Sequence, residues 1–177
     1  MWSPFSQHGR VTSTAAWCTS TEACTVADLL SHEEVLARVP QQEPFRFIDE
    51  IVELDSEHIV ARYTFREDAD FYRGHFPGNP VTPGVILVEA MAQAGVVAYG
   101  IYLYAAEFSA EEVEKLITVF TDAQVDFSGI VKPGDRVTTT ARKSFFRRKK
   151  LRCEMEMKLD DGTLVCSGVL SGMGVPR

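Results

Sequence analysis

The sequence predicts an α+β fold in which one long helix is enclosed by a curved antiparallel sheet. Two observations carry this prediction: an apolar run from Val85 to Ala106, and six segments with the β-branched and aromatic composition of strands. A helix that is apolar on all sides must be covered on all sides, and strands with polar outer faces can cover it. With 177 residues, of which 45% are apolar and 24% charged, the chain has the size and composition of one globular domain.

The first 25 residues lack the regular pattern of the rest. They are rich in Ser and Thr, show no apolar period and contain no apolar core of a secretory signal. We predict a disordered extension over 1–25 and a single domain over 26–177. An organelle transit peptide and a mis-assigned start codon are the alternatives, although Arg10 is the single arginine of this segment.

From residue 26 the elements follow in a regular order. VADLLSHEEVLARV (26–39) has apolar residues at intervals of three and four, which predicts a helix. The predicted strands cover PFRFIDEIVELD (44–55), HIVARYTF (58–65), LITVFTDAQVDF (116–127), RVTTTARKSFF (136–146), KKLRCEMEMKL (149–159) and TLVCSGVLSGM (163–173). Before the fourth of them, KPGD places Pro133 and Gly134 at the centre of a type II turn.

The last two strands predict their own register. Asp161-Gly162 is a favoured two-residue turn, and it places Asp160 opposite Thr163. The pairs are then Leu159 with Leu164, Met157 with Cys166, Met155 with Gly168 and Cys153 with Leu170. One face of this hairpin is apolar and the other is charged, so the pattern and the turn agree. Because Cys153 and Cys166 face other residues, the register argues against a disulfide between them.

The apolar run of 85–106 also has the length of a membrane span. Glu89, Gln93, Gly95 and Gly100 interrupt it, and strands are present to enclose it, so we favour a buried core helix. A net charge of −7 argues against a surface built for nucleic acid. Four cysteines without a CxxC pair or a Cys/His cluster indicate neither a zinc site nor a disulfide framework, and they fit a reducing cytoplasm.

The stretch GHFPGNPVTPGVILVEAMAQ (74–93) joins a Gly/Pro loop to the start of the apolar helix. Thr82 suits the N-cap, Pro83 the first helical position and Gly84 the second. Free N–H groups in this first turn lie at the positive end of the helix dipole, where they can hold a developing oxyanion, and Gly84 lets a substrate approach closely. The alternative is that Gly84 only relieves crowding and that Thr82 accepts the free N–H itself.

Glu89 and Gln93 lie four residues apart on one face of this helix. A buried carboxylate must be paired, protonated or exposed to a polar cavity, so Glu89 is either a structural partner of a loop or a functional acid. His75, taken alone, is either a loop histidine with satisfied hydrogen bonds or a base. A histidine, a helix N-terminus and a carboxylate in one cleft would together supply a base, an oxyanion site and an acid.

This stretch closely resembles the signature of the 3-hydroxyacyl-acyl carrier protein dehydratases of the FabZ/FabA type, and the similarity extends over about residues 35–175. The resemblance implies a hot-dog fold, a homodimer whose sheets join edge to edge, an acyl tunnel at the interface, and no metal or organic cofactor. A larger assembly, such as a trimer of dimers, is an alternative that the sequence does not decide. It also implies that His75 is the base and Glu89 the acid, from different protomers, and that the Gly84 N–H polarises the thioester carbonyl.

The implied reaction removes water from a (3R)-3-hydroxyacyl-acyl carrier protein to give the trans-2-enoyl product, in type II fatty acid synthesis or synthesis of a related acyl chain. We predict Val85, Phe76 and Gln93 as further substrate-binding residues, with Gln93 able to orient the acid. The family can hold a cis peptide between the residues that correspond to His75 and Phe76. A Glu rather than an Asp at position 89 favours dehydration without isomerisation.

Two features depart from the family pattern: PQQEPFRF (40–47) lacks the usual His-Arg-Tyr-type stretch, and Thr82 stands where an apolar residue is more usual. Because of these departures the subfamily is not determined, but neither departure involves His75 or Glu89. A hot-dog acyl thioesterase and a non-catalytic acyl-binding module are the alternative functions.

The segment RKSFFRRKKLR (142–152) holds seven of the 18 Lys and Arg residues and no acid. A solvated hairpin tip and a nucleic-acid patch are two explanations. Acyl carrier protein is strongly acidic, so we instead predict a docking patch beside the tunnel mouth. Its residues are Arg147, Arg148, Lys149 and Lys150, with Phe145 or Phe146 offering apolar contact.

Overall fold

The computed structural model describes residues 30–176, so the extension predicted over 1–25 lies outside the described residues. The helical segments are α1 (His32–Arg38), η2 (Asp70–Arg73), α2 (Gly84–Ala92), η3 (Gln93–Ala98), α3 (Tyr99–Glu107) and α4 (Ala110–Glu114). The strands are β1 (Glu50–Leu54), β2 (His58–Thr64), β3 (Leu116–Phe127), β4 (Arg136–Arg147), β5 (Lys150–Leu159) and β6 (Leu164–Pro176). They form one antiparallel sheet in the order β1-β2-β4-β5-β6-β3, which confirms the predicted α+β class.

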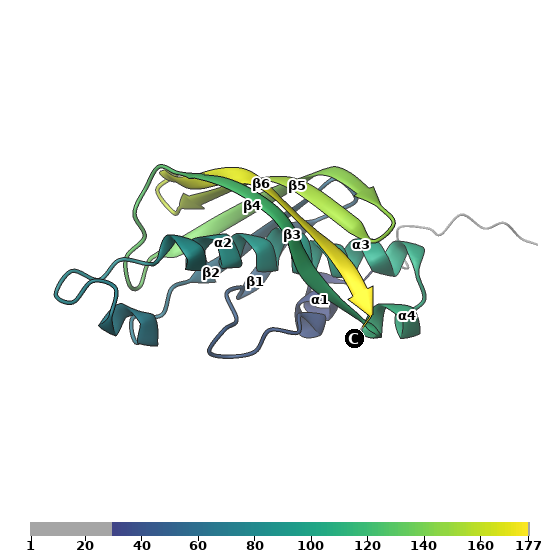
Figure 1. Ribbon diagram of the computed structural model, residues 1–177, viewed down its shortest axis with the longest axis horizontal. Helices are drawn as coiled ribbons and strands as arrows, with labels where there is room; N and C mark the ends of the chain where they lie inside the picture. Colours follow the sequence, from purple (N-terminus) through teal and green to yellow (C-terminus); the bar gives the residue numbers. More distant parts are fainter. Residues whose placement is uncertain (1–29, 177) are drawn as a thin grey trace, which may run out of the picture.

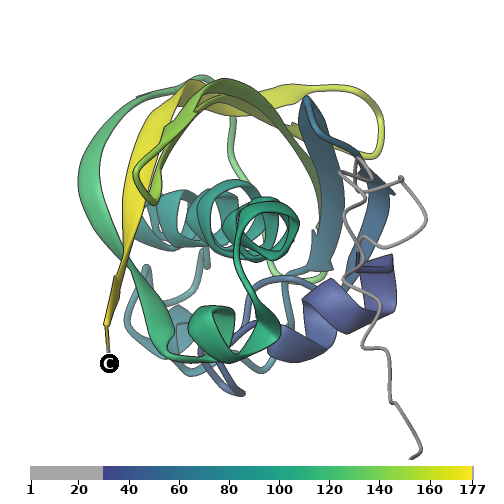
Figure 2. The same ribbon diagram turned by 90° about the vertical axis from the view of Figure 1, so that its right-hand side faces the viewer.

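The segments α2, η3 and α3 follow one another without a break, and the sheet curves around the resulting central helix (Figure 1 and Figure 2). This helix runs from Gly84 to Glu107, and its most apolar window has a mean hydropathy of 1.6 and is 72% buried. By length and composition alone it could span a membrane. Since the sheet encloses it, it is the core helix that the apolar run of 85–106 predicts.

The middle of the central helix lies very close to the sheet. A Cβ added to Gly95 would lie 2.6 Å from the Cβ of Ala141 on β4 and 2.5 Å from the Cε of Met155 on β5. Packed side chains cannot accept such distances without moving, so this approach requires glycine. The helix is π-helical over the same residues, in η3, directly after the turn that carries Glu89. Such segments often occur at functional sites.

The β5–β6 hairpin keeps the predicted register over most of its length. Cys153 faces Leu170, and Met157 faces Cys166, as predicted. Both cysteines are buried free thiols, which confirms that they do not form a disulfide with each other. The apolar face of the hairpin packs on the central helix, since Cys153, Met155 and Met157 are all buried.

The predicted turn of this hairpin is wrong. Leu159 donates its N–H to the carbonyl of Thr163 rather than pairing with Leu164, which faces Lys158. The loop therefore has three residues and ends on Gly162, whose φ is +86°. The sequence Asp-Asp-Gly is equally compatible with a two-residue turn and with a type I turn followed by a left-handed glycine, and the structure has the second. A bulge next to Lys158 restores the predicted register farther along the strands.

The strand predicted over 44–55 is shorter than expected, because β1 begins at Glu50. The backbone of the preceding segment is bound by the Gln93 side chain instead of by a neighbouring strand. Gln93 Nε2 donates to the carbonyl of Phe45 at 2.9 Å, and Gln93 Oε1 accepts from the N–H of Phe47 at 2.7 Å. Backbone groups that are satisfied in this way are not available to a sheet ladder.

The KPGD segment forms the predicted turn. The N–H of Asp135 donates to the carbonyl of Lys132 at 3.1 Å, and Gly134 has a φ of +85°. A type II turn requires a positive φ at its third residue, which glycine adopts without a steric cost.

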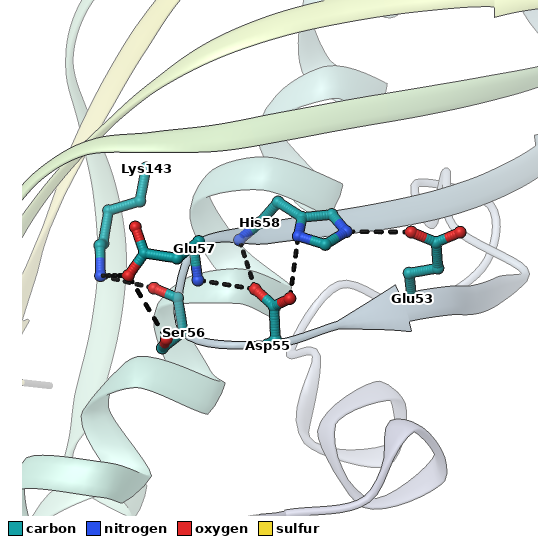
Figure 3. A network of polar contacts seen from close by, with 6 residues as sticks. All are labelled: Glu53, Asp55, Ser56, Glu57, His58 and Lys143. Atoms are coloured by element: carbon teal, nitrogen blue, oxygen red, sulfur yellow. Dashed lines mark hydrogen bonds and ion pairs between the residues drawn. The ribbon is translucent and has the colours of Figure 1, made fainter.

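The β1–β2 turn is held by charged and polar groups (Figure 3). Asp55 accepts from the N–H groups of Glu57 and His58, and the His58 imidazole lies 2.9 Å from a carboxylate oxygen of Glu53. Lys143 Nζ on β4 lies 3.2 Å from Glu57 Oε1. One cation of the basic segment 142–152 is therefore used to tie this turn to β4.

Candidate active site

His75 lies in the loop between η2 and α2, and the backbone holds one of its ring nitrogens. Nδ1 is 2.9 Å from the carbonyl oxygen of Val81. A carbonyl oxygen can only accept, so in the neutral ring Nδ1 carries the proton and Nε2 has the free lone pair of a base. The peptide between His75 and Phe76 is cis, as the resemblance implies, and the Phe76 side chain is 57% exposed. The loop thus presents a half-buried imidazole beside an exposed apolar ring.

The N-cap of the central helix is Pro83 rather than Thr82, and the first helical residue is Gly84. The prediction for Thr82 is wrong because tertiary contacts occupy it: its N–H donates to the carbonyl of Val131, and its hydroxyl lies 2.5 Å from the Tyr72 hydroxyl. Within residues 30–176, the N–H groups of Gly84 and Val85 find no acceptor. Thr82 therefore does not accept them, and they are free to bind an oxyanion.

Gly84 lies against the end of β3. A Cβ at this position would lie 3.2 Å from the Phe127 ring, so a larger residue would crowd both the ring and the helix N-terminus. Three apolar side chains of this region are exposed to solvent: Val85 to 76%, Phe127 to 53% and Ile130 to 61%. Exposed apolar side chains, including the Phe127 ring that contacts Gly84, thus lie beside the free N–H groups.

The side chain of Gln93 connects Glu89 to the loop that precedes β1. Gln93 is fully buried, and its Nε2 donates to Glu89 Oε1 at 2.9 Å as well as to the carbonyl of Phe45. Because the loop fixes the amide on both sides, the amide in turn fixes the Glu89 carboxyl. Glu89 Oε2 has no hydrogen-bond partner in the described part of the chain, so one oxygen is held and the other remains available.

Glu89 lines a cavity of about 130 Å³ between the central helix and β3. The other wall residues are Gln41, Ala92, Val96, Val97, Thr118 and Phe120. Two of them, Val97 and Thr118, also line an adjoining hollow of about 380 Å³. The remaining walls of that hollow are Arg38, Pro40, Ile101, Val113, Leu116 and Ile117. The larger hollow has mainly apolar walls, and because it shares two walls with the cavity it extends the space from Glu89 along the helix, as an acyl chain would require.

The cations predicted to dock a carrier protein lie at the other end of the central helix from Gly84 (Figure 1). The Tyr104 hydroxyl in α3 donates to the carbonyl of Lys149, and the Lys149 ammonium lies 5.0 Å from the centre of the Phe108 ring. The 24-residue helix is about 36 Å long. Within one protomer, therefore, the cations are not beside His75.

The turn between β4 and β5 has an unusual backbone. Arg147 pairs with Lys150, and the two residues between them, Arg148 and Lys149, have φ angles of +53° and +63°. Turns of this kind favour Asn-Gly or Gly-Gly, because side chains destabilise the left-handed conformation. Asp122 on β3 neutralises part of the basic segment, since its carboxylate lies 3.5 Å from Lys150 and contacts Arg152. Within residues 30–176, Arg147 and Arg148 form no ion pair.

The structure thus places the predicted site residues in three groups. His75, Phe76, Gly84 and Val85 lie at the N-terminal end of the central helix, Glu89 and Gln93 lie at the cavity, and the four cations lie at the β4–β5 turn. His75 is not a wall residue of the Glu89 cavity within the protomer. The sequence prediction missed Gln41 as a cavity residue. The one feature of the sequence that could have drawn attention to Gln41 is the departure of PQQ from the family pattern.

Comparisons with known proteins identify the family of this chain. Residues 39–168 match a family model described as the FabA-like domain. The 3-hydroxyacyl-[acyl-carrier-protein] dehydratase FabZ of Streptococcus pyogenes serotype M49 (strain NZ131) is 34% identical over 146 residues, which cover 81% of this chain and 96% of that protein. The protein of the same name from S. pyogenes serotype M1 is 36% identical over 141 residues, which cover 78% and 94%.

Solved structures show the same fold at low identity. The dehydratase heterocomplex ApeI:P from Xenorhabdus doucetiae has a TM-score of 0.65 at 16% identity, covering 81% of this chain and 91% of the other. The thioesterase HI1161 from Haemophilus influenzae has a TM-score of 0.60 at 17% identity, covering 83% and 92%. At this low identity, the two solved structures support only the fold. The family is shown by the family model, which matches most of the chain. The chain therefore belongs to the FabA-like family and has its hot-dog fold.

Proposed function

We propose that this protein dehydrates (3R)-3-hydroxyacyl-acyl carrier protein to the trans-2-enoyl product, in type II fatty acid synthesis or synthesis of a related acyl chain. The observation that carries the proposal is the orientation of the Glu89 carboxyl by Gln93 at the wall of a cavity that adjoins a mainly apolar hollow. A base on the His75 loop and free N–H groups at Gly84 supply the other two functions that the reaction needs. Relatives that share about a third of their residues with this chain are named as dehydratases of this type.

The chemistry requires a base, an oxyanion site and an acid. Nε2 of neutral His75 removes a proton from C2, and the Gly84 N–H stabilises the negative charge that develops on the thioester oxygen. The electron pair forms the C2=C3 double bond as the C3–O bond breaks, and Glu89 gives its proton to the departing hydroxyl, so that one water leaves. The proton on His75 then returns to Glu89 through solvent. These steps use no metal or organic cofactor.

A homodimer would complete the site. Among residues 30–176, β3 pairs with β6 alone and its other edge has no neighbouring strand. This edge exposes Ile117, Val119 and Phe120 at 37%, 37% and 46%. Long apolar edges of this kind pair with another strand, and a two-fold axis through the edge would make the contact self-complementary. In such a dimer His75 of one protomer and Glu89 of its partner would share one site.

The same dimer would bring the basic turn to a tunnel mouth. The turn lies at the Leu116 end of β3, because Lys150 faces Met173 and Met173 faces Val119, whereas Gly84 packs at the Phe127 end. Antiparallel pairing of β3 with its copy places the Leu116 end of one strand opposite the Phe127 end of the other. The docking cations would therefore serve the site of the partner subunit.

Reversing the charge at Arg147 and Arg148 should raise KM for carrier-protein substrates and weaken the salt dependence of KM. The reason is that an acidic carrier protein would lose its steering partner, while chemistry at His75 and Glu89 would continue. Turnover of a small acyl-thioester analogue should stay nearly unchanged, and steady-state kinetics with both substrates provides the measurement. Equal losses with both substrates would contradict the docking role and place the patch in the fold or in the catalytic site.

Replacing Arg148-Lys149 by Asn-Gly should stabilise the protein by about 1–2 kcal/mol, because both residues occupy the left-handed region in which side chains are unfavourable. Thermal unfolding should show a Tm higher by about 3–6 °C. The same variant should bind carrier protein more weakly. A lower Tm would contradict the assigned turn, and a control that replaces Arg142, away from the turn, should leave Tm within about 1 °C.

An assay with a 3-hydroxyacyl-carrier-protein substrate tests the proposed function directly. Enoyl product supports it, free acid indicates the thioesterase alternative, and binding without turnover indicates an acyl-binding module. The structures of thioesterases among the solved neighbours reflect the shared fold and do not favour hydrolysis.

A further inference from the structure

The side chain of Gln41 contains a buried polar atom that lacks a partner. Its Oε1 is shielded from solvent and accepts no hydrogen bond within residues 30–176. Gln41 follows α1 and lines the same cavity of about 130 Å³ as Glu89. Buried acceptors are almost always paired in folded proteins, and an unpaired one destabilises the protein unless a water or a ligand donates to it.

The protein itself offers little to this oxygen. Four of the other cavity residues, Ala92, Val96, Val97 and Phe120, have apolar side chains. The neighbouring amide of Gln42 points back to its own backbone, where Nε2 donates to the carbonyls of Val39 and Pro40. A hydrogen bond from a bound molecule would therefore satisfy Gln41, and such a molecule would also meet Glu89.

We propose that Gln41 is a positioning residue that accepts a hydrogen bond from the 3-hydroxyl of the substrate. This inference rests on the proposed function. A saturated 3-hydroxyacyl chain carries one donor near the reacting carbons, and that donor is the hydroxyl on C3. When its proton points to Gln41 Oε1, a lone pair of the same oxygen is free to face Glu89, which donates its proton as the C3–O bond breaks. The water then leaves from between the amide and the carboxylate.

This role has a consequence for selectivity. A saturated acyl chain and an enoyl chain both lack the hydroxyl. In either complex, Gln41 Oε1 would therefore receive no hydrogen bond from the ligand. A site with a buried acceptor discriminates strongly against a ligand that leaves the acceptor unpaired. Gln41 should therefore favour the 3-hydroxyacyl substrate over both chains.

The test compares Gln41→Met with Gln42→Met, its matched neighbour outside the cavity, in the homodimer. Methionine keeps the length of the glutamine side chain and removes the amide. Binding is measured in a His75→Ala background, which prevents turnover, with N-acetylcysteamine thioesters of a (3R)-3-hydroxyacyl chain and of the saturated chain of equal length. Gln41→Met should reduce the preference for the hydroxylated thioester about tenfold, the effect of one hydrogen bond, and should leave binding of the saturated chain unchanged or tighter. Gln42→Met should leave the preference unchanged.

The remaining readouts separate this inference from a structural role and from the proposed function. With His75 present, Gln41→Met should lower kcat for dehydration about tenfold while Tm stays equal or rises, because removal of an unpaired buried oxygen does not destabilise the fold. An unchanged preference in binding overturns the role of Gln41, whether or not the enzyme turns over. If Gln41→Met weakens the binding of both thioesters equally and also lowers Tm, the role of Gln41 is overturned as well. Absence of enoyl product from the unmodified enzyme would instead contradict the proposed function, and the binding preference would still decide the role of Gln41.

Discussion

A heterodimer of His75→Ala and Glu89→Gln protomers is expected to regain about half of the activity of the unmodified dimer, although each variant alone loses about 10³-fold or more. If each site takes His75 from one protomer and Glu89 from the other, one of the two sites in this heterodimer contains both intact residues. Co-expression with two different affinity tags, followed by two purification steps, isolates the heterodimer. The measurement is enoyl formation from a 3-hydroxyacyl-carrier-protein substrate.

A second heterodimer serves as the control, with both substitutions in one protomer and an unmodified partner. It contains the same number of intact residues, but each composite site would lack one of them, so it should be inactive. Sites within single protomers would reverse the two results, with activity in the control and none in the test heterodimer. The pair of measurements therefore decides whether the separation of His75 from the Glu89 cavity within a protomer is closed by the dimer.

Replacement of Gly168 by alanine is expected to destabilise the protein by about 3 kcal/mol or more, which is the upper range for overpacking a core. Gly168 lies on β6 between β5 and β3, and an added Cβ would collide with the carbonyl oxygen of Gln124 and lie 2.8 Å from the Cα of Val125. Both obstacles belong to the backbone of β3, so the strand itself would have to move. Calorimetry should show a Tm lower by about 6 °C or more.

The effect should extend beyond stability, because β3 provides both a cavity wall at Thr118 and Phe120 and the proposed dimer edge. Size-exclusion chromatography of Gly168→Ala should show a weaker dimer. Ser167→Ala, one residue earlier on the same strand, is the matched control and should change stability by less than about 0.5 kcal/mol. A Tm loss of less than about 2 °C for Gly168→Ala would show that β3 and β6 are not as close as the structure describes.

Much of the fold could be predicted because its signals are local. The apolar run of 85–106 identified the core helix, which the structure extends to Gly84 and Glu107, and the alternating pattern of β5 and β6 set their pairing at Cys153 and Met157. The Pro-Gly pair of KPGD defined a turn that the structure contains. Each of these features depends on side chains within one turn or one strand pair. Over such short distances, the spacing of apolar residues determines which face of a helix or strand is buried.

The remaining features depended on groups that are distant in the sequence. Thr82 has the chemistry of an N-cap, yet its contacts with Tyr72 and Val131 remove it from that role. The segment before β1 has the composition of a strand, yet the Gln93 amide binds its backbone. In both cases a hydrogen bond across the fold competed with a local preference of similar size, and the local preference lost.

The residue types of the candidate site were evident from the sequence, but their arrangement was not. A histidine, a glycine at a helix start and a carboxylate with a glutamine four residues on were enough to predict the chemistry and, through the resemblance, the family. Only the tertiary structure separated His75 from the Glu89 cavity, placed the basic turn at the far end of the helix, and left Gln41 Oε1 without a partner beside Glu89. The physical reason is that residue chemistry is a property of each side chain, whereas distance and hydrogen-bond satisfaction depend on the path of the whole chain.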